Sequence, residues 1–296
     1  MPKLKLAAGT VNQTPIDWES NKANILELIG NARDQDVDIL CLPELCITGY
    51  GCEDLFLGEW IYEKAFEILE EIIPECHGIT VAISLPLAYD TRHYNTTCLV
   101  SDGKPVGIYA KQFLALDGVH YEPRWFSPWP AGKENMIQVC GTHVPVGDVT
   151  FKIHGVHIGF EICEDAWRAN RPACRLVEKG VNLILNPSAS HFAFGKTLLR
   201  EELIVTSSEN FKCTYVYANL LGNEAGRMIY DGEMLIAHHG KLAARNKWLS
   251  FQRHQLLTAA IDIGNESADV PEPVEYDRSK ETEFVQASAL ALLDYM

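Results

Sequence analysis

The segment Val156–Trp167 is an alternating apolar run that ends in a cysteine flanked by carboxylates. The apolar residues at every second position are Val156, Ile158, Phe160 and Ile162. This spacing predicts a β-strand with one buried face, and the loss of the pattern after Asp165 places Cys163 at the strand's end. A strand end holds a side chain rigidly and leaves it accessible, so it suits a catalytic group. Most free cysteines are buried structural residues, however, so a nucleophile requires partners elsewhere in the chain.

The composition allows a large hydrophobic core and argues against anionic partners. With 296 residues and 47% hydrophobic content, the chain can form one large α/β domain or two smaller ones. The formal net charge is -15 and no run of Lys and Arg interrupts it. Phosphate-rich surfaces would be repelled, so we expect neither a nucleic acid nor an anionic membrane as a partner.

The cysteine and histidine pattern predicts a reducing compartment and no metal site. Nine scattered cysteines are typical of reduced thiols, and there is no Cys-x-x-Cys pair. His154 and His157, like His238 and His239, would point to opposite faces of a strand. No apolar stretch approaches the ~20 residues that span a bilayer, and the N-terminal residues do not resemble a secretory signal. We therefore expect a cytoplasmic protein.

The N-terminal part predicts a β-α-β unit. A strand is expected over 3–11, a helix to about Asp36 with Ser20 or Asn21 as its cap, and a buried strand over 37–42. This order favours a layered α/β architecture.

The rest of the chain alternates strands, helices and hairpins. Residues 112–133 are the exception, because this long aromatic-rich segment lacks periodicity, and loops of this length are commonly functional. The predicted elements are helices over 59–73, 172–179 and 196–212, strands over 79–85, 181–185, 214–220, 228–237 and 256–263, a hairpin pairing 95–100 with 106–110, and a further hairpin before Cys163.

The C-terminal part differs in composition. Residues 264–280 are acidic, contain two prolines and are typical of a linker. Beyond them, six residues predict one face of a helix that has no C-cap signal before Met296: Phe284, Ala287, Ser288, Ala291, Leu292 and Tyr295. We expect a domain over 1–263, a linker over 264–281 and, over 282–296, the start of a helix of a further domain. The alternative is a C-terminal helix that docks on its own domain.

Three predicted strand ends carry reactive groups. Glu44 follows one strand, Lys111 ends a hairpin, and Cys163 ends the run described above. A carboxylate, an ammonium and a thiol in one pocket suffice for acyl transfer without a histidine. Taken singly, Glu44 could instead cap a helix and Lys111 could be a solvated hairpin end.

The contexts of these three residues carry a family resemblance. Leu-Pro-Glu at 42–44, Ala-Lys-Gln at 110–112 and Glu-Ile-Cys-Glu-Asp at 161–165 resemble the nitrilase, or carbon–nitrogen hydrolase, superfamily. With the segment 41–56, the resemblance is closer to the glutaminase domains of glutamine-dependent NAD+ synthetases, over about residues 3–263. It implies an α/β fold, an αββα sandwich as a single large domain, and hydrolysis of the amide of L-glutamine.

The resemblance also implies roles for the reactive residues. Cys163 would attack the amide and form a thioester, Glu44 would transfer protons, and Lys111 with the backbone N–H of Glu164 would stabilise the oxyanion. Lys111 is also expected to lower the pKa of the Cys163 thiol. Glu122 matches a second glutamate of the superfamily, although the residues before it depart from the family pattern.

Further positions match glutamine contacts of the family. These are Tyr50, Glu164, Trp167, Ser190 and Lys196. Each could instead serve packing or capping. Lys196 stands where related domains tend to carry an arginine, and a lysine cannot bind a carboxylate bidentately.

The resemblance further implies a synthetase domain as partner, large homo-oligomers and no cofactor for the glutaminase step. The synthetase domain would use ATP and Mg²⁺ to amidate nicotinic acid adenine dinucleotide to NAD+. This sequence contains neither Ser-Gly-Gly-x-Asp-Ser nor Gly-x-Gly-x-x-Gly. Two alternatives remain open: a stand-alone amidase acting on another small amide, and a non-catalytic assembly module.

Overall fold

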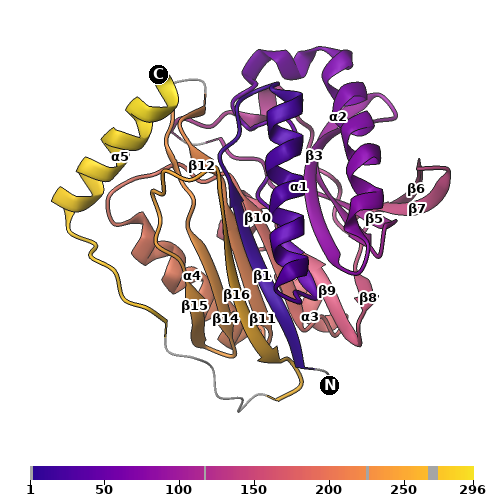
Figure 1. Cartoon of the computed structure of the whole chain (residues 1–296). Coiled ribbons are helices and arrows are strands. Elements are labelled where there is room, and N and C mark those ends of the chain that lie inside the picture. The colour runs from indigo at the N-terminus through magenta and orange to yellow at the C-terminus, as the bar shows by residue number, and fades with distance from the viewer. Residues whose placement is uncertain (1–2, 117, 225–226, 266–272) are drawn as a thin grey trace.

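Two β-sheets pack face to face and carry helices on their outer faces (Figure 1). The computed structural model describes residues 3–116, 118–224, 227–265 and 273–296. The arrangement confirms the α/β fold class and the expected αββα layering.

The first sheet contains the N-terminal β-α-β unit and the long hairpins. Its order is β16-β1-β2-β3-β4-β5-β7-β6. The strands are β1 (Lys3–Val11), β2 (Ile39–Cys41), β3 (Thr80–Tyr89), β4 (Arg92–Ser101), β5 (Lys104–Ala110), β6 (Glu134–Val139), β7 (Thr142–Gly147) and β16 (His254–Asp262). β1, β2 and β3 are parallel neighbours, which the helical crossovers between them require.

The second sheet contains the strand that precedes Cys163. Its order is β15-β14-β11-β10-β9-β8. The strands are β8 (Phe151–Ile153), β9 (Val156–Phe160), β10 (Leu183–Ser188), β11 (Thr214–Asn219), β14 (Met234–His238) and β15 (Lys241–Arg245), beside a small ribbon of β12 (Leu221–Gly222) and β13 (Tyr230–Asp231).

The helices cover the two outer faces. α1 (Trp18–Asp34) and α2 (Glu59–Ile72) pack on the first sheet, and α3 (Ala173–Glu178) and α4 (Lys196–Asn210) pack on the second. Short 3-10 helices are η1 (Glu53–Leu57), η2 (Ile73–Cys76), η3 (Glu122–Arg124) and η4 (Cys163–Trp167). None of the described helices is long and apolar enough to cross a membrane.

Alternation along each strand explains both interfaces of the sandwich. In β1, Leu6 and Ala8 face the second sheet, whereas Ala7 contributes to the core beneath α1. Phe160 and Leu185 of the second sheet complete the layer between the sheets. Because the central strands are buried on both faces, their sequences are nearly continuous apolar runs.

The α1 cap differs from the sequence-based prediction. Asp17, rather than Ser20 or Asn21, caps the helix, because its Oδ1 accepts from the N–H of Ser20 at 3.2 Å. The Asn21 side chain instead donates to the carbonyls of Thr14 and Ile47 at 2.8 and 3.2 Å. Asn21 therefore fixes the loop before the helix.

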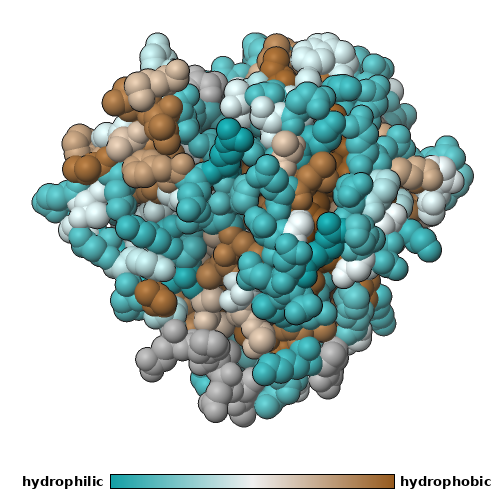
Figure 2. All heavy atoms as spheres, in the orientation of Figure 1, coloured by the Kyte–Doolittle hydropathy of each residue, from teal (hydrophilic) through white to brown (hydrophobic). Residues whose placement is uncertain are grey.

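The C-terminal helix α5 (Lys280–Tyr295) packs on the body of the protein through a different face from the one predicted. Ala287 and Leu290 are buried in a cluster with Leu221, Trp248 and Leu249. The other members of the predicted face do not join that core, and Phe284, Leu292 and Tyr295 are exposed. The buried stripe is Glu283, Ala287 and Leu290, at the i, i+4, i+7 spacing of a helix. Hydrophobic atoms therefore gather on the surface over α5 (Figure 2). Part of the predicted linker, residues 266–272, lies outside the described residues.

Candidate active site

The three predicted strand ends meet, but they come from both sheets. Glu44 follows β2 and Lys111 follows β5 in the first sheet, whereas Cys163 follows β9 in the second. The three ends therefore do not converge within a single sheet. Face-to-face packing brings them together instead.

A buried ion-pair network forms the centre of the site. Lys111 Nζ donates to Glu44 Oε1 at 2.5 Å and to Glu122 Oε1 at 2.8 Å, and all three side chains are fully buried. Asn95 Nδ2 donates to the same two oxygens at 2.7 and 3.3 Å. We call Glu44, Asn95, Lys111 and Glu122 the carboxylate–lysine cluster.

Backbone N–H groups hold the outer oxygen of each carboxylate. Ala189 N donates to Glu44 Oε2 and Ala115 N donates to Glu122 Oε2, each at 2.8 Å. Both carboxylates thus bond through both oxygens, which fixes their orientation toward Lys111.

Asp165 connects the turn at Cys163 to the segment that follows Lys111. Its Oδ2 accepts from Ile162 N at 3.0 Å, and its Oδ1 accepts from Gln112 N and Phe113 N at 3.0 and 2.7 Å. Cys163 itself begins η4 with φ of 44°, in the left-handed region that non-glycine residues seldom adopt. The site therefore places its thiol at a tightly held, uncommon backbone conformation.

Burial is the largest influence on the pKa values of the groups in the site. It raises the pKa of Glu44 to about 7, although the charge of Lys111 acts in the opposite direction. Burial also raises the pKa of the Cys163 thiol, the Glu44 charge adds to this, and Lys111 lowers it by less. Lys111 therefore lowers the thiol pKa, as expected from the sequence, but burial and the Glu44 charge outweigh its effect. Burial opposes the charge on Lys111 itself, but Glu122 and Glu44 outweigh it and keep its pKa well above the usual value.

A hydrogen-bonded chain leads from Glu122 to Lys196. Tyr50 OH donates to Glu122 Oε1 at 3.1 Å and lies 3.2 Å from His120 Nδ1. His120 Nε2 lies 2.9 Å from His191 Nδ1, which is 3.3 Å from Lys196 Nζ. Burial lowers the pKa of His120 to about 4, so its ring is neutral near pH 7. Two predicted substrate contacts, Tyr50 and Lys196, are thus joined to the cluster.

The other predicted contacts bond elsewhere. Glu164 pairs with Arg168 at 2.7 Å, and Trp167 at the end of η4 is exposed. Ser190 is buried, and Arg200 Nη2 donates to its hydroxyl at 3.2 Å. Their predicted role in binding substrate stays a prediction.

Sequence reasoning missed Asn95, His120, His191 and Asp165. Asn95 had a signal, because it begins the predicted hairpin strand 95–100, whose partner strand 106–110 leads to Lys111. His120 stands two residues before Glu122 and His191 directly follows Ser190, so proximity to predicted site residues was the available signal. Among the described residues, no group of three or more His, Cys, Asp or Glu is placed to hold a metal ion.

Comparisons with known proteins identify the family of the chain. Residues 5–268 match the family described as carbon–nitrogen hydrolase. The putative glutamine-dependent NAD(+) synthetase of Schizosaccharomyces pombe is 32% identical over 88% of this chain and 39% of its own. The glutamine-dependent NAD(+) synthetase of Homo sapiens is 30% identical over 88% and 38%. This chain therefore spans less than half the length of these relatives.

Solved structures of related proteins have the same fold. A glutamine-dependent NAD(+) synthetase from Cytophaga hutchinsonii is 50% identical with a TM-score of 0.89, over 100% of this chain and 47% of that one. An amidase from Nesterenkonia sp. shares the fold, with 20% identity and a TM-score of 0.71 over 88% and 90%.

Proposed function

Because this chain belongs to the carbon–nitrogen hydrolase family, we propose that it hydrolyses the side-chain amide of L-glutamine with Cys163 as the nucleophile. The observation that carries the proposal is the carboxylate–lysine cluster, buried where the strand ends of the two sheets meet, with both oxygens of each carboxylate hydrogen-bonded. The names of the relatives support glutamine as the substrate.

Glu44 is the proton carrier in this proposal. With a pKa of about 7, it exists in both protonation states near neutral pH, which suits a group that first accepts and then donates. The Cys163 thiol passes its proton to Glu44 as sulfur attacks the amide carbon. Glu44 then protonates the amide nitrogen, the C–N bond breaks, ammonia leaves and a thioester remains.

Lys111 supplies the positive charge. Its ammonium, held between two carboxylates, stabilises the oxyanion of the tetrahedral intermediate together with the backbone N–H of Glu164. In the second half of the reaction a water gives a proton to Glu44 and attacks the thioester. The C–S bond breaks, the thiolate takes the proton back, and glutamate leaves. Glu122 fixes Lys111 in both halves.

The substrate's amino-acid end occupies the surroundings of Cys163 in this proposal. Tyr50, Glu164, Trp167 and Ser190 line its path, and Lys196 pairs with the α-carboxylate. Support comes from the chain of hydrogen bonds that links Lys196 to Tyr50 and Glu122.

We further propose that the ammonia serves a synthetase domain beyond these 296 residues, which amidates nicotinic acid adenine dinucleotide with ATP and Mg²⁺. The longer relatives, all named as synthetases, support this. The proposal includes a glutaminase domain over 1–263, a linker over 264–281, a helix over 282–296 shared with that domain, and a cytoplasmic homo-oligomer.

The test measures ammonia released from glutamine by the purified chain and by Cys163→Ala. Cys174→Ala, at an exposed cysteine, is the matched control. We expect release by the parent and the control and none by Cys163→Ala. Equal rates in all three would refute Cys163 as nucleophile.

The same assay distinguishes the two alternative functions. Faster hydrolysis of acetamide or butyramide than of glutamine would favour a small-amide amidase. No hydrolysis of any amide, with or without an added synthetase domain, would favour an assembly role.

A further inference from the structure

A hydrogen-bonded chain reaches Glu122 from outside the carboxylate–lysine cluster, and the donors along it fix its direction. Tyr50 OH lies 3.1 Å from Glu122 Oε1, His120 Nδ1 lies 3.2 Å from Tyr50 OH, and His191 Nδ1 lies 2.9 Å from His120 Nε2. Tyr50 and His120 are buried. Each contact holds one proton, so the placement of the proton in one contact determines its placement in the next.

Glu122 is the acceptor at the inner end of the chain. Its Oε1 accepts from Lys111 Nζ at 2.8 Å and from Asn95 Nδ2 at 3.3 Å, and its Oε2 accepts from Ala115 N at 2.8 Å. Because each of these neighbours donates, the carboxyl group acts as an acceptor, and the Tyr50 hydroxyl donates to it as well. Burial and the charge of Glu122 raise the pKa of Tyr50 well above its usual value, so the hydroxyl keeps the proton that it donates.

His120 is therefore the donor to Tyr50. The hydroxyl has a single proton, which lies toward Glu122, so the hydroxyl oxygen accepts from His120 Nδ1–H. A neutral imidazole has one N–H only, so Nε2 of the same ring is an acceptor. His191 then donates to that nitrogen through its own Nδ1–H.

The ring of His120 stays neutral among the groups that face it. Burial lowers its pKa to about 4, and His191, Lys111 and Lys196 act in the same direction, whereas the charge of Glu122 opposes them. These four residues belong to the segments after β10 and β5, to α4 and to η3. A single N–H on His120 is therefore expected throughout the neutral pH range.

We propose that His120 is a positioning residue that carries its proton on Nδ1 and so directs the Tyr50 hydroxyl to Glu122. The chain then runs one way, from His191 to the carboxylate–lysine cluster. Its effect on rate rests on the glutamine hydrolysis proposed above, whereas the position of the proton does not.

The direction of the chain affects how Lys111 shares its charge. Lys111 lies between Glu122 and Glu44 and is the proposed stabiliser of the oxyanion. A hydroxyl that donates to Glu122 disperses part of the negative charge there, and a donor to that hydroxyl strengthens the bond. Glu122 then holds the ammonium less strongly, which leaves more of its charge for the oxyanion.

The same bond acts on the proton carrier. The ionisable groups around Glu44 are a cation, a carboxylate, a thiol and two phenols: Lys111, Glu122, Cys163, Tyr50 and Tyr230. Among them the charge of Glu122 raises the pKa of Glu44. Dispersal of that charge by the Tyr50 hydroxyl therefore lowers the pKa of Glu44, and its loss should raise it.

The first test locates the proton of His120 without substrate. The whole chain is labelled with nitrogen-15 in its histidine rings, and the His120 signals are assigned by their loss in His120→Asn. Nuclear magnetic resonance should show a proton on Nδ1, none on Nε2, and no titration from pH 6 to 8. A proton on Nε2, or a doubly protonated ring in this range, would overturn the proposal. This result does not depend on whether the chain hydrolyses glutamine.

The second test compares two replacements that each keep one end of the ring. The side-chain amide of asparagine is as many bonds from Cβ as Nδ1, and that of glutamine as many as Nε2. His120→Asn keeps a donor for Tyr50 and should retain the kcat of the parent for glutamine. His120→Gln keeps only the contact with His191, so kcat should fall by about fivefold or more with KM unchanged, as for a hydrogen bond that matters in the transition state.

The pH profile separates positioning from a general loss of structure. In His120→Gln the midpoint of kcat/KM should move to higher pH, because Glu122 keeps more of its charge and raises the pKa of Glu44 further. His120→Asn should keep the midpoint of the parent. Equal losses of kcat in the two variants, or a loss in His120→Gln with an unmoved midpoint, would overturn the proposal.

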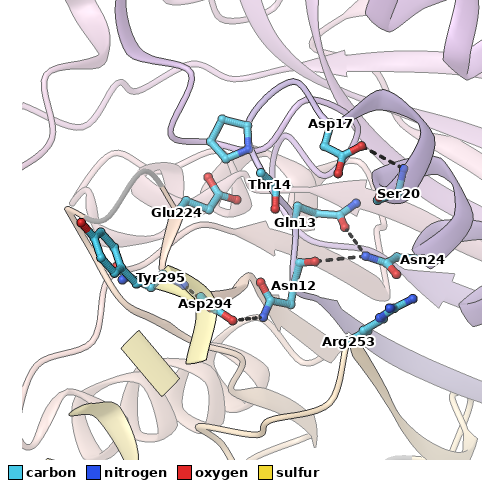
Figure 3. A pocket seen from close by; sticks show the side chains of 12 residues that line it. Asn12, Gln13, Thr14, Asp17, Ser20, Asn24, Glu224, Arg253, Asp294 and Tyr295 are labelled. Carbon is cyan, nitrogen blue, oxygen red and sulfur yellow. Dashed lines mark hydrogen bonds between the residues drawn. The ribbon is translucent and has the colours of Figure 1, made fainter. Parts of the chain in front are cut away.

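Two control variants remove buried polar contacts away from the cluster. Asn24 donates to Asn12 O and Gln13 Oε1 at 3.1 and 3.0 Å (Figure 3), in the wall of a cavity of about 590 Å³ whose lining residues include neither Cys163 nor any member of the cluster. His238 is a buried histidine of β14. Asn24→Ala and His238→Gln should keep the kcat and the pH midpoint of the parent, even where circular dichroism shows a lower melting temperature. A shift in either control as large as that in His120→Gln would overturn the proposal.

Discussion

The side chain of Lys111 balances two carboxylates in a fully buried space. It is the one cation within hydrogen-bond distance of both Glu44 and Glu122 among the described residues. The protonation states of these three buried groups are coupled, because the charge on each one shifts the pKa values of the other two. The protonation of Glu44 is therefore where the chemistry of the site depends on pH.

In the proposed mechanism, the pH dependence of glutamine hydrolysis follows from Glu44. Its pKa of about 7 lies above the usual value for glutamate, because burial disfavours the anion. A base must be ionised to accept a proton, so kcat/KM should rise with pH through about 7 and fall about tenfold per unit well below it. Rates of ammonia release between pH 5 and 9 would show this. A profile that is flat from pH 5 to 8 would exclude Glu44 as the base.

Lys111→Met should cost both activity and stability. The variant leaves two adjacent buried carboxylates without a cation, and breaking a buried ion pair in this way costs about 3–5 kcal/mol. Urea unfolding would measure the loss, with Lys104→Met, at the exposed first residue of β5, as the control. Equal stability of the two variants would show that the network contributes nothing to folding.

Local sequence predicted part of the site at this scale. Glu44, Lys111 and Cys163 each follow a predicted strand: a buried apolar run located Glu44, a hairpin located Lys111, and period-two alternation located Cys163. Asn95 and His120 bond to residues far away in the chain, at separations of 51 and 70 residues. No local pattern encodes such contacts.

At the scale of elements, the identity of a strand or helix was easier to predict than the residue at which it begins or ends. Hydrophobic periodicity predicted which segments are strands and which are helices. Their ends depend on hydrogen bonds to residues elsewhere in the fold. The α1 cap moved from the predicted Ser20 or Asn21 to Asp17, since Asn21 is used to bond the neighbouring loop.

Asp17→Ala should lower the free energy of unfolding by about 1 kcal/mol, the usual effect of losing an N-cap side chain. Ser20→Ala, three residues on and exposed, should change it by less than about 0.5 kcal/mol. Chemical denaturation of both variants tests the assignment. A larger effect at Ser20 would restore the sequence-based prediction.

At the scale of the whole molecule, α5 is held by a small cluster distinct from the sandwich core. Leu290 is fully buried there and Leu292 is 59% exposed, although they are two residues apart. The sequence predicted a helix here but not the face that is buried. Both faces carry apolar residues, so helical periodicity does not distinguish the face with Phe284, Leu292 and Tyr295 from the buried one.

Leu290→Ala should release α5 from Trp248, with a loss of about 2–5 kcal/mol in the docking of the helix. Tryptophan fluorescence and proteolysis near residue 280 would detect this. Leu292→Ala should leave both readouts unchanged. Identical behaviour of the two variants would contradict the described docking face.

The division of Glu44 and Cys163 between two sheets has a consequence for how activity is acquired. A chain in which only one sheet has formed holds either the proposed base or the proposed nucleophile, but not both. Under the proposed mechanism, catalysis therefore requires the assembled sandwich, and a partly folded chain would be inactive. Activity should therefore appear only after both sheets have formed and packed together.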